Sequence, residues 1–94
     1  MANCKMEGPS LTGYTIYTKS KCGYCRRAKE LLPEAVVINC DVYLENGRIA
    51  FLLKMDEFSK ASPRTFPMIF SDGVFVGGYD ETKEKIDFNT TVDF

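Results

Sequence analysis

The stretch YTIYTKSKCGYCRRAKELL, residues 14–32, decides the fold of this chain. Its first five residues, Tyr14 to Thr18, are all β-branched or aromatic, which is typical of a strand. A short polar turn follows, and we expect a helix from about Gly23 to Leu32 that ends at a proline. The pair Cys22 and Cys25 therefore lies where a strand ends and a helix begins.

This placement predicts that Cys22 is a reactive thiolate. The first backbone N–H groups of a helix have no partner within the helix, and the helix dipole adds partial positive charge there. Lys19 and Lys21 add further attraction for a thiolate. Such surroundings lower the pKa of a cysteine to about 3.5–7.5. We expect Cys22 to be the attacking nucleophile, and Cys25, one turn deeper, to be the resolving thiol that forms a disulfide with it.

The same segment is a basic island in an acidic chain. Residues 19–29 carry five Lys and Arg residues and no acidic residue, whereas the 94-residue chain has a formal net charge of −1. We interpret this island as a local anion site. The alternative is a solvated helix face with no binding role.

The net charge argues against nucleic-acid binding, and the longest apolar runs are too short for a membrane span.

The four cysteines indicate redox chemistry. No apolar secretory segment is apparent, so we expect a cytoplasmic, reducing location, where a close cysteine pair is more often catalytic or metal-binding than structural. Histidine is absent, which excludes Cys–His zinc sites and catalytic pairs that need histidine. A zinc site would have to use Cys4 and Cys40, which have no paired spacing, so we expect no metal. We expect Cys4 to be exposed and Cys40 to be a small core residue.

The length of the chain predicts one domain, residues 14–94, after a flexible leader, residues 1–13, that has no hydrophobic period. The apolar run Ala35 to Cys40 is typical of a strand buried on both faces. Asn46–Gly47 marks a turn. The helical spacing of apolar residues after it predicts a helix from Arg48 to Lys60.

Two further strands and a helix are expected in the last third of the chain. The apolar runs 68–70 and 74–76 are joined through Asp72–Gly73, which is a strong hairpin signal. We expect Asp80 to cap a last helix that has Glu81 in its first turn and ends near residue 88, followed by a frayed tail.

The resulting order β-α-β-α-β-β-α predicts an α/β fold. The first two strands, separated by a helix, should be parallel, and the hairpin should add an antiparallel pair. We therefore expect a four-stranded mixed sheet with helices on its faces. In such sheets the chemistry collects at the carboxyl ends of the parallel strands, and the strand that ends at Thr18 points at Cys22.

Three segments resemble the glutaredoxin family, and together they cover most of residues 14–88. YTKSKCGYCRRAKELL (17–32) resembles the active-site segment of dithiol glutaredoxins, in which C-P-Y-C is common. RTFPMIF (64–70) resembles the family's R-T-V-P segment, and GGYDE (77–81) resembles its G-G-x-D-[DE] segment. The segments occur in the family's order and near its usual spacing. The resemblance implies the thioredoxin fold, with three helices, and a cis peptide bond before Pro67.

The resemblance also implies a groove for glutathione beside Cys22. The backbone of Phe66 would pair with the cysteine portion of glutathione, and Lys19 would approach its glycine carboxylate. The γ-glutamyl carboxylate would rest on N–H groups at the start of the last helix. The implied glutathione-binding residues are Lys19, Tyr24, Arg64, Thr65, Phe66, Pro67, Gly78, Tyr79 and Asp80.

The implied activity is that of a glutathione-dependent thiol–disulfide oxidoreductase. It would reduce glutathione mixed disulfides and protein disulfides, with glutathione as co-substrate and no tightly bound cofactor. Deglutathionylation and electron transport to targets such as ribonucleotide reductase are typical of the family. We expect the protein to be a monomer.

Two departures from the family pattern leave alternatives open. Gly23 stands where the family commonly has proline, and Phe66 stands where it has valine. Some family members with a small residue at the first of these positions bind a [2Fe–2S] cluster between two subunits, through the first cysteine and glutathione. A cluster-binding carrier or sensor is therefore the alternative function. A protein served by thioredoxin reductase is disfavoured, because the chain lacks tryptophan and has the segment Gly77 to Asp80.

Overall fold

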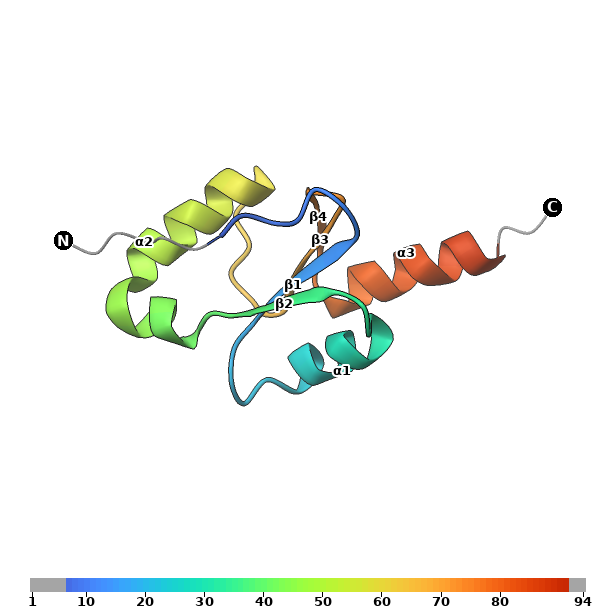
Figure 1. The fold of residues 1–94 in the computed structure, drawn as a ribbon, viewed down its shortest axis with the longest axis horizontal. Coiled ribbons are helices and arrows are strands. Elements are labelled where there is room, and N and C mark those ends of the chain that lie inside the picture. Colours follow the sequence, from blue (N-terminus) through green and yellow to red (C-terminus); the bar gives the residue numbers. More distant parts are fainter. Residues whose placement is uncertain (1–6, 92–94) are drawn as a thin grey trace.

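The computed structural model of the protein describes residues 7–91 and the side chains of residues 7–88. Its elements follow the predicted order: β1 (Tyr14–Thr18), α1 (Gly23–Leu31), β2 (Val36–Asn39), α2 (Asp41–Ser59), β3 (Met68–Ser71), β4 (Val74–Gly77) and α3 (Tyr79–Thr91). The strands form one four-stranded sheet, and the three helices lie around it (Figure 1). This is the architecture expected of the thioredoxin fold.

The sheet is mixed, as predicted, with strand order β2-β1-β3-β4. β1 and β2 are parallel, and Ile16 pairs with Val37 in this register. β3 is antiparallel to both β1 and β4. β1 and β3 are thus the central strands, and β1 runs directly to the loop that carries the cysteine pair.

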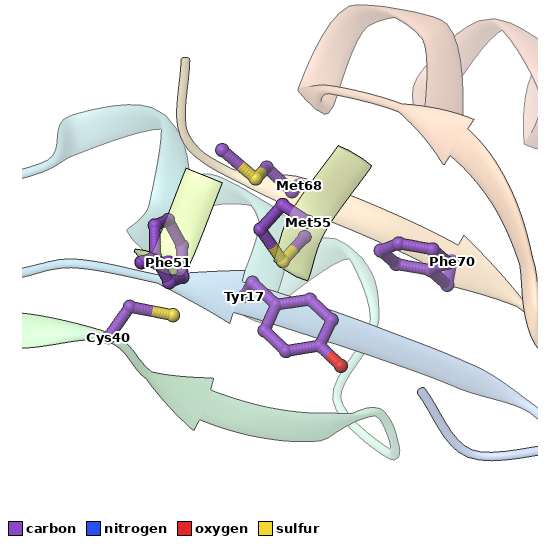
Figure 2. Packing of buried hydrophobic residues seen from close by; sticks show 6 residues of the cluster. All are labelled: Tyr17, Cys40, Phe51, Met55, Met68 and Phe70. Carbon is purple, nitrogen blue, oxygen red and sulfur yellow. The ribbon is translucent and has the colours of Figure 1, made fainter. Parts of the chain in front are cut away.

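One face of the sheet packs against α2. Tyr17 of β1 and Phe70 of β3 project from this face, and their rings meet edge to face with centroids 5.5 Å apart. Phe51 and Met55 of α2 pack onto them, and both are fully buried (Figure 2). Burying large side chains of this kind stabilises a fold by about 1.5–3 kcal/mol each.

The other face packs against α1 and α3. Ile16 and Ile69 point to this side, because successive side chains of a strand alternate between the faces of a sheet. They meet Ala28 and Leu32 at the end of α1, and Ile86 of α3 packs against the same cluster. This cluster holds α1, which carries the cysteine pair at its N-terminus, against β1 and β3.

The prediction that residues 35–40 form a strand buried on both faces is wrong. β2 is an edge strand, and the side chains of Val36 and Val37 are 49% and 43% exposed. The buried central strands are β1 and β3 instead. The apolar run in β2 therefore reflects strand propensity rather than full burial.

The turn predicted at Asn46–Gly47 is present as a break within α2. Gly47 has φ −177° and ψ 79°, which interrupts the helix and separates residues 41–46 from the predicted helix that follows. The short helical segment before the break was not predicted. It begins at Asp41, where the N–H group donates to Asn39 Oδ1 over 2.9 Å.

The hairpin at Asp72–Gly73 is confirmed. Both residues have positive φ, 51° and 84°, as a tight hairpin turn requires. α3 differs from the prediction at both ends. It begins at Tyr79, so Asp80 lies within the first turn and is not the cap, and it continues through Thr91 where a frayed tail was expected from residue 89. The last three residues lie outside the described part of the chain.

Residues 7–13 contact the sheet through several hydrogen bonds. Tyr17 Oη donates to the carbonyl of Glu7 over 2.8 Å, and the N–H of Ser10 donates to Thr15 Oγ1 over 2.9 Å. Cys4, which was predicted to be exposed, lies outside the described residues. The division of the chain into a flexible leader, residues 1–13, and a domain, residues 14–94, stays a prediction. Among the helices that the structure describes, none is long and apolar enough to cross a membrane.

Candidate active site

Cys22 is the N-cap residue of α1. Its Sγ accepts a hydrogen bond from the N–H of Cys25 over 3.2 Å, which is the contact expected of a sulfur at a helix N-terminus. The two cysteines are joined as a disulfide, with their Cα atoms 5.2 Å apart. Cys25 is only 1% exposed, whereas Cys22 is partly exposed. The arrangement therefore places one sulfur at the surface and its partner beneath it.

The loop before Cys22 is tied to α2 by Asp41. The N–H of Ser20 donates to Asp41 Oδ1 over 2.9 Å, and the Ser20 hydroxyl donates to Asp41 Oδ2. These bonds lower the pKa of the Asp41 carboxyl below its ordinary value, and the charge of Lys19 adds to the effect. The sequence analysis missed this contact, because nothing in the local pattern links two residues so far apart.

Phe66 and Pro67 form the wall beside the cysteine pair. Their peptide bond is cis, as the resemblance implied. The carbonyl oxygen of Phe66 lies 3.8 Å from Cys22 Sγ. The Phe66 ring stacks on Phe51 with centroids 5.8 Å apart, and Lys19 Nζ lies 5.8 Å from the centroid of the same ring. The backbone of Phe66 is thereby held next to the sulfur.

A groove of about 370 Å³ lies along this wall and is called the Phe66 groove below. It brings together seven of the nine residues that the sequence analysis assigned to glutathione. The lining residues are Tyr24, Thr65, Phe66, Pro67, Gly78, Tyr79, Asp80 and Glu81. The rings of Tyr24 and Tyr79 meet with centroids 5.8 Å apart, so they close one side of the groove.

Glu81 is the lining residue that the sequence analysis did not assign to this groove. Its Oε1 accepts a hydrogen bond of 2.6 Å from the N–H of Gly78, the residue before α3. A glutamate in the third helical position commonly reaches back to the cap in this way. This spacing was visible in the sequence and could have identified Glu81. The N–H groups of Tyr79 and Asp80 have no partner within the helix, because they belong to its first turn.

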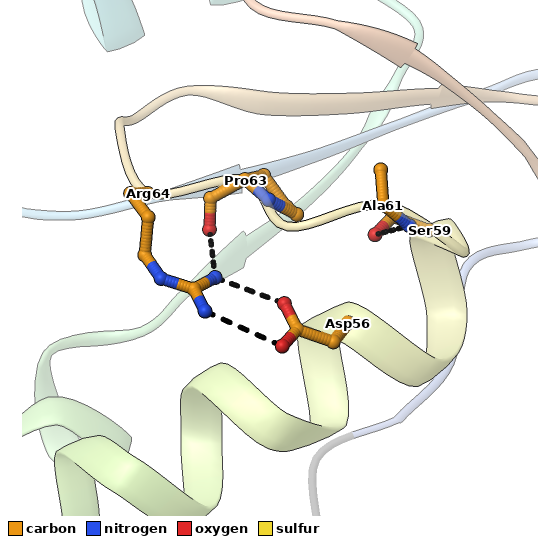
Figure 3. A network of polar contacts seen from close by, with 5 residues as sticks. All are labelled: Asp56, Ser59, Ala61, Pro63 and Arg64. Atoms are coloured by element: carbon orange, nitrogen blue, oxygen red, sulfur yellow. Dashed lines mark hydrogen bonds and ion pairs between the residues drawn. The ribbon is translucent and has the colours of Figure 1, made fainter.

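Arg64 does not line the Phe66 groove. Its guanidinium donates to both oxygens of Asp56 on α2, over 2.9 and 3.3 Å, and to the carbonyl of Pro63 over 2.9 Å (Figure 3). The hydrogen bonds from Arg64 hold the pKa of the Asp56 carboxyl below its ordinary value. The structure therefore turns this guanidinium toward α2, and the predicted role of Arg64 in binding glutathione stays a prediction.

A second cavity, of about 480 Å³, opens on Cys22 and is called the basic cavity below. Its lining comes from the β1–α1 loop, the first turns of α1 and the end of β2. The lining residues are Lys19, Ser20, Lys21, Cys22, Gly23, Cys25, Arg26, Lys29 and Asn39. Lys19 thus lines this cavity, although its Nζ also lies near the Phe66 ring. The sequence analysis predicted an anion site in residues 19–29. Four of the five cationic residues of this segment line the basic cavity.

The remaining cysteine of the described residues belongs to the hydrophobic core. Cys40 is fully buried in the core beside Phe51, as expected of a small core residue. Within the described residues, no group of three or more His, Cys, Asp or Glu side chains is placed to hold a metal ion. The arrangement that remains is a dithiol pair that can pass between a disulfide and two thiols, beside a groove with backbone hydrogen-bonding groups.

Comparison with known proteins agrees with this geometry. The family model named Glutaredoxin matches residues 14–76. Glutaredoxin 1 of Rickettsia bellii (strain RML369-C) is 35% identical over 79 residues, which are 81% of this chain and 79% of that protein. The structure of glutaredoxin 1 from Francisella tularensis complexed with cacodylate matches with TM-score 0.69 and 28% identity, over 83% of this chain and 95% of that one. A buckwheat glutaredoxin–glutathione complex matches with TM-score 0.66 and 26% identity, over 84% of this chain and 72% of that one.

Proposed function

Because the chain belongs to the glutaredoxin family, we propose that it is a glutathione-dependent oxidoreductase that reduces glutathione mixed disulfides and protein disulfides. The observation that carries this proposal is the position of Cys22 Sγ, which caps α1, accepts the N–H of Cys25 and lies beside the Phe66 groove. A sulfur in this position is favoured as a thiolate, which is the form that attacks disulfides.

Reduction of a glutathionylated protein takes two exchange steps. The Cys22 thiolate attacks the glutathionyl sulfur, the substrate S–S bond breaks, and the protein thiolate leaves and takes up a proton. The thiolate of a second glutathione then attacks the glutathionyl sulfur on Cys22. This step releases oxidised glutathione and restores the Cys22 thiolate.

Reduction of a protein disulfide uses Cys25 as well. Cys22 first forms a mixed disulfide with one substrate sulfur, and the other substrate sulfur leaves as a thiol. Cys25 then attacks Cys22 Sγ, which releases the second substrate sulfur and leaves the Cys22–Cys25 disulfide, the state present in the structure. Two glutathione molecules reduce this disulfide and become oxidised glutathione.

The Phe66 groove supports glutathione as the co-substrate. The Phe66 backbone lies next to Cys22 Sγ, where the cysteine portion of glutathione would pair with it. We place the γ-glutamyl carboxylate on the N–H groups of Tyr79 and Asp80, because Glu81 already accepts the N–H of Gly78. Lys19 would attract the glycine carboxylate, since Arg64 is paired with Asp56.

The test is a coupled assay in which glutathione reductase and NADPH report the oxidised glutathione formed. Its substrates are a small glutathione mixed disulfide and a protein disulfide. We expect Cys22→Ser to abolish turnover of both substrates. Cys25→Ser should still turn over the mixed disulfide and should lose the protein disulfide, because only the latter needs a resolving thiol. Turnover of the mixed disulfide by Cys22→Ser would rule out the proposed mechanism.

Three further expectations go with this proposal. We propose a cytoplasmic location and a monomeric state. The cluster-binding alternative depends on Gly23 alone and stays a prediction. It would require visible absorbance and a dimer after anaerobic purification with glutathione, and a colourless monomer under those conditions would exclude it.

A further inference from the structure

The basic cavity is lined by positive charge and opens on the reacting sulfur of Cys22. Four cationic side chains line it, those of Lys19, Lys21, Arg26 and Lys29, and no carboxylate belongs to its lining. All four residues are exposed. Cys22 lines the same cavity, so a molecule held there is next to the disulfide under attack.

These cations form no ion pair with the described side chains of the protein. Within the part of the chain whose side chains are described, no carboxylate lies within ion-pair distance of any of the four. Asp41 is the carboxylate that acts on one of them: the charge of Lys19 contributes to the lowered pKa of Asp41, whose oxygens also accept hydrogen bonds from Ser20. Asn39 also lines the cavity, but its side chain is engaged with Asp41, whose N–H its Oδ1 accepts.

The Phe66 groove and the basic cavity have no lining residue in common. The groove is built by the loop before β3, the start of α3 and Tyr24 of α1, whereas the cavity is built by the β1–α1 loop, other residues of α1 and the end of β2. If glutathione occupies the groove, the rest of a glutathionylated protein must lie over the other surfaces that adjoin Cys22. The basic cavity is such a surface, and Lys21, Arg26 and Lys29 remain there for the protein half when Lys19 attracts the glycine carboxylate of glutathione.

We propose that the basic cavity is a subsite for an acidic segment of the polypeptide substrate, next to the cysteine whose disulfide is reduced. This inference rests on the proposed function and adds its substrate class, namely proteins with Asp or Glu close to the target cysteine. A cavity lined by charge of one sign raises the local concentration of oppositely charged substrates and their rate of association. The attraction acts on the polypeptide half of the substrate, so a small mixed disulfide without that half gains little from it.

The test compares two glutathionylated peptides of equal length in the coupled assay. One carries Asp and Glu around the glutathionylated cysteine, and the other carries Asn and Gln. For the wild type we expect kcat/KM to be about tenfold higher for the acidic peptide at low ionic strength. Added salt should reduce this preference, because the attraction is between exposed charges.

Arg26→Gln/Lys29→Gln is the informative variant, because these two residues line the cavity and have no part in the proposed chemistry or glutathione binding. We expect the ratio of its kcat/KM for the acidic peptide to its kcat/KM for the neutral peptide to fall to about two or less. Its kcat/KM for a small glutathione mixed disulfide should stay at the wild-type level. The matched control, Arg48→Gln/Lys85→Gln, removes the same charge from exposed positions outside the cavity and should keep the preference.

The outcomes separate the two proposals. Equal wild-type rates for the two peptides, or a preference that survives in Arg26→Gln/Lys29→Gln, would overturn the subsite while leaving the proposed function intact. Loss of the preference in the control as well would assign it to net charge and would also overturn the subsite. If the wild type turned over neither the peptides nor the small mixed disulfide, the proposed function itself would fail, and the subsite with it.

Discussion

At the scale of the residue, two glycines close to the cysteine pair and the Phe66 groove meet different surroundings. Gly23 is the first residue of α1, and a Cβ built on it would meet nothing within 4 Å. Gly77 ends β4 with φ +137°, in a region that side-chain-bearing residues rarely adopt. A Cβ on Gly77 would lie 2.8 Å from Glu81 Cβ and 2.9 Å from Glu81 Oε1. Gly77 therefore leaves room for the Glu81 side chain that accepts the N–H of Gly78.

We expect Gly77→Ala to lower the free energy of unfolding by about 1–3 kcal/mol, because it forces an unfavourable φ and displaces Glu81. Urea unfolding at neutral pH measures this change. Gly23→Ala is the matched control, since it adds the same methyl group in open space within a helix. It should raise the free energy of unfolding by about 0.5–1 kcal/mol. A Gly77→Ala protein as stable as the wild type would contradict this account of the turn.

At the scale of the element, α2 connects the two loops that form the site. Near its start, Asp41 binds Ser20 in the loop before Cys22. Near its end, Asp56 binds Arg64 in the loop before Phe66 and Pro67. The break at Gly47 separates these two contacts, and Phe51 and Met55 anchor the part of α2 after the break on the sheet. Each helical segment of α2 therefore holds one of the two loops beside Cys22.

The Asp56–Arg64 contact predicts a pH-dependent difference in stability. The folded state lowers the pKa of Asp56, chiefly through its hydrogen bonds with Arg64. The stabilisation is therefore fully present above the ordinary aspartate pKa and is lost as the pH falls through the folded pKa. At about pH 7 we expect the urea midpoint of unfolding to be lower for Asp56→Asn than for the wild type. The difference between the two midpoints should disappear at about pH 2.

A control on the same helix separates this contact from general surface charge. Glu57 Oε2 lies 3.7 Å from Lys54 Nζ in an ion pair at the surface. Such pairs contribute little to stability. Glu57→Gln should therefore unfold like the wild type at neutral pH. If Asp56→Asn behaved like Glu57→Gln at every pH, the Asp56–Arg64 contact would not fasten the loop.

At the scale of the whole molecule, the features that could be predicted from the sequence depend on local rules. The strand Tyr14–Thr18 followed from its residue types, the hairpin from Asp72–Gly73, and the N-terminal position of Cys22 from the polar turn between that strand and the predicted helix. The resemblance to the family added the cis peptide bond at Pro67 and seven residues of the Phe66 groove.

The features that could not be predicted depend on which segments meet in three dimensions. An apolar run does not reveal whether its strand is central or at an edge, and β2 proved to be an edge strand. The charge of Arg64 was visible, but its partner Asp56 is determined by the path of the loop between them. The contact of Ser20 with Asp41 likewise forms only when the β1–α1 loop meets α2.

The central claim is that the fold, rather than the intrinsic chemistry of cysteine, ionises Cys22. The measurement that tests it most directly is the rate of alkylation of Cys22 as a function of pH, in a Cys4→Ser/Cys25→Ser variant. The rate is followed by peptide mass spectrometry, so that Cys40 is distinguished from Cys22. The backbone N–H at position 25 remains in this variant and can still donate to Cys22 Sγ.

We compare the folded protein with the same chain unfolded in urea. In urea the rate should reach half its maximum at about pH 8.5, which is the ordinary pKa of cysteine. In the folded protein this midpoint should lie at about pH 7.5 or lower, because the N-terminus of α1 and the charges of Lys19 and Lys21 stabilise the thiolate. Coincident midpoints in the folded and unfolded protein would contradict the claim.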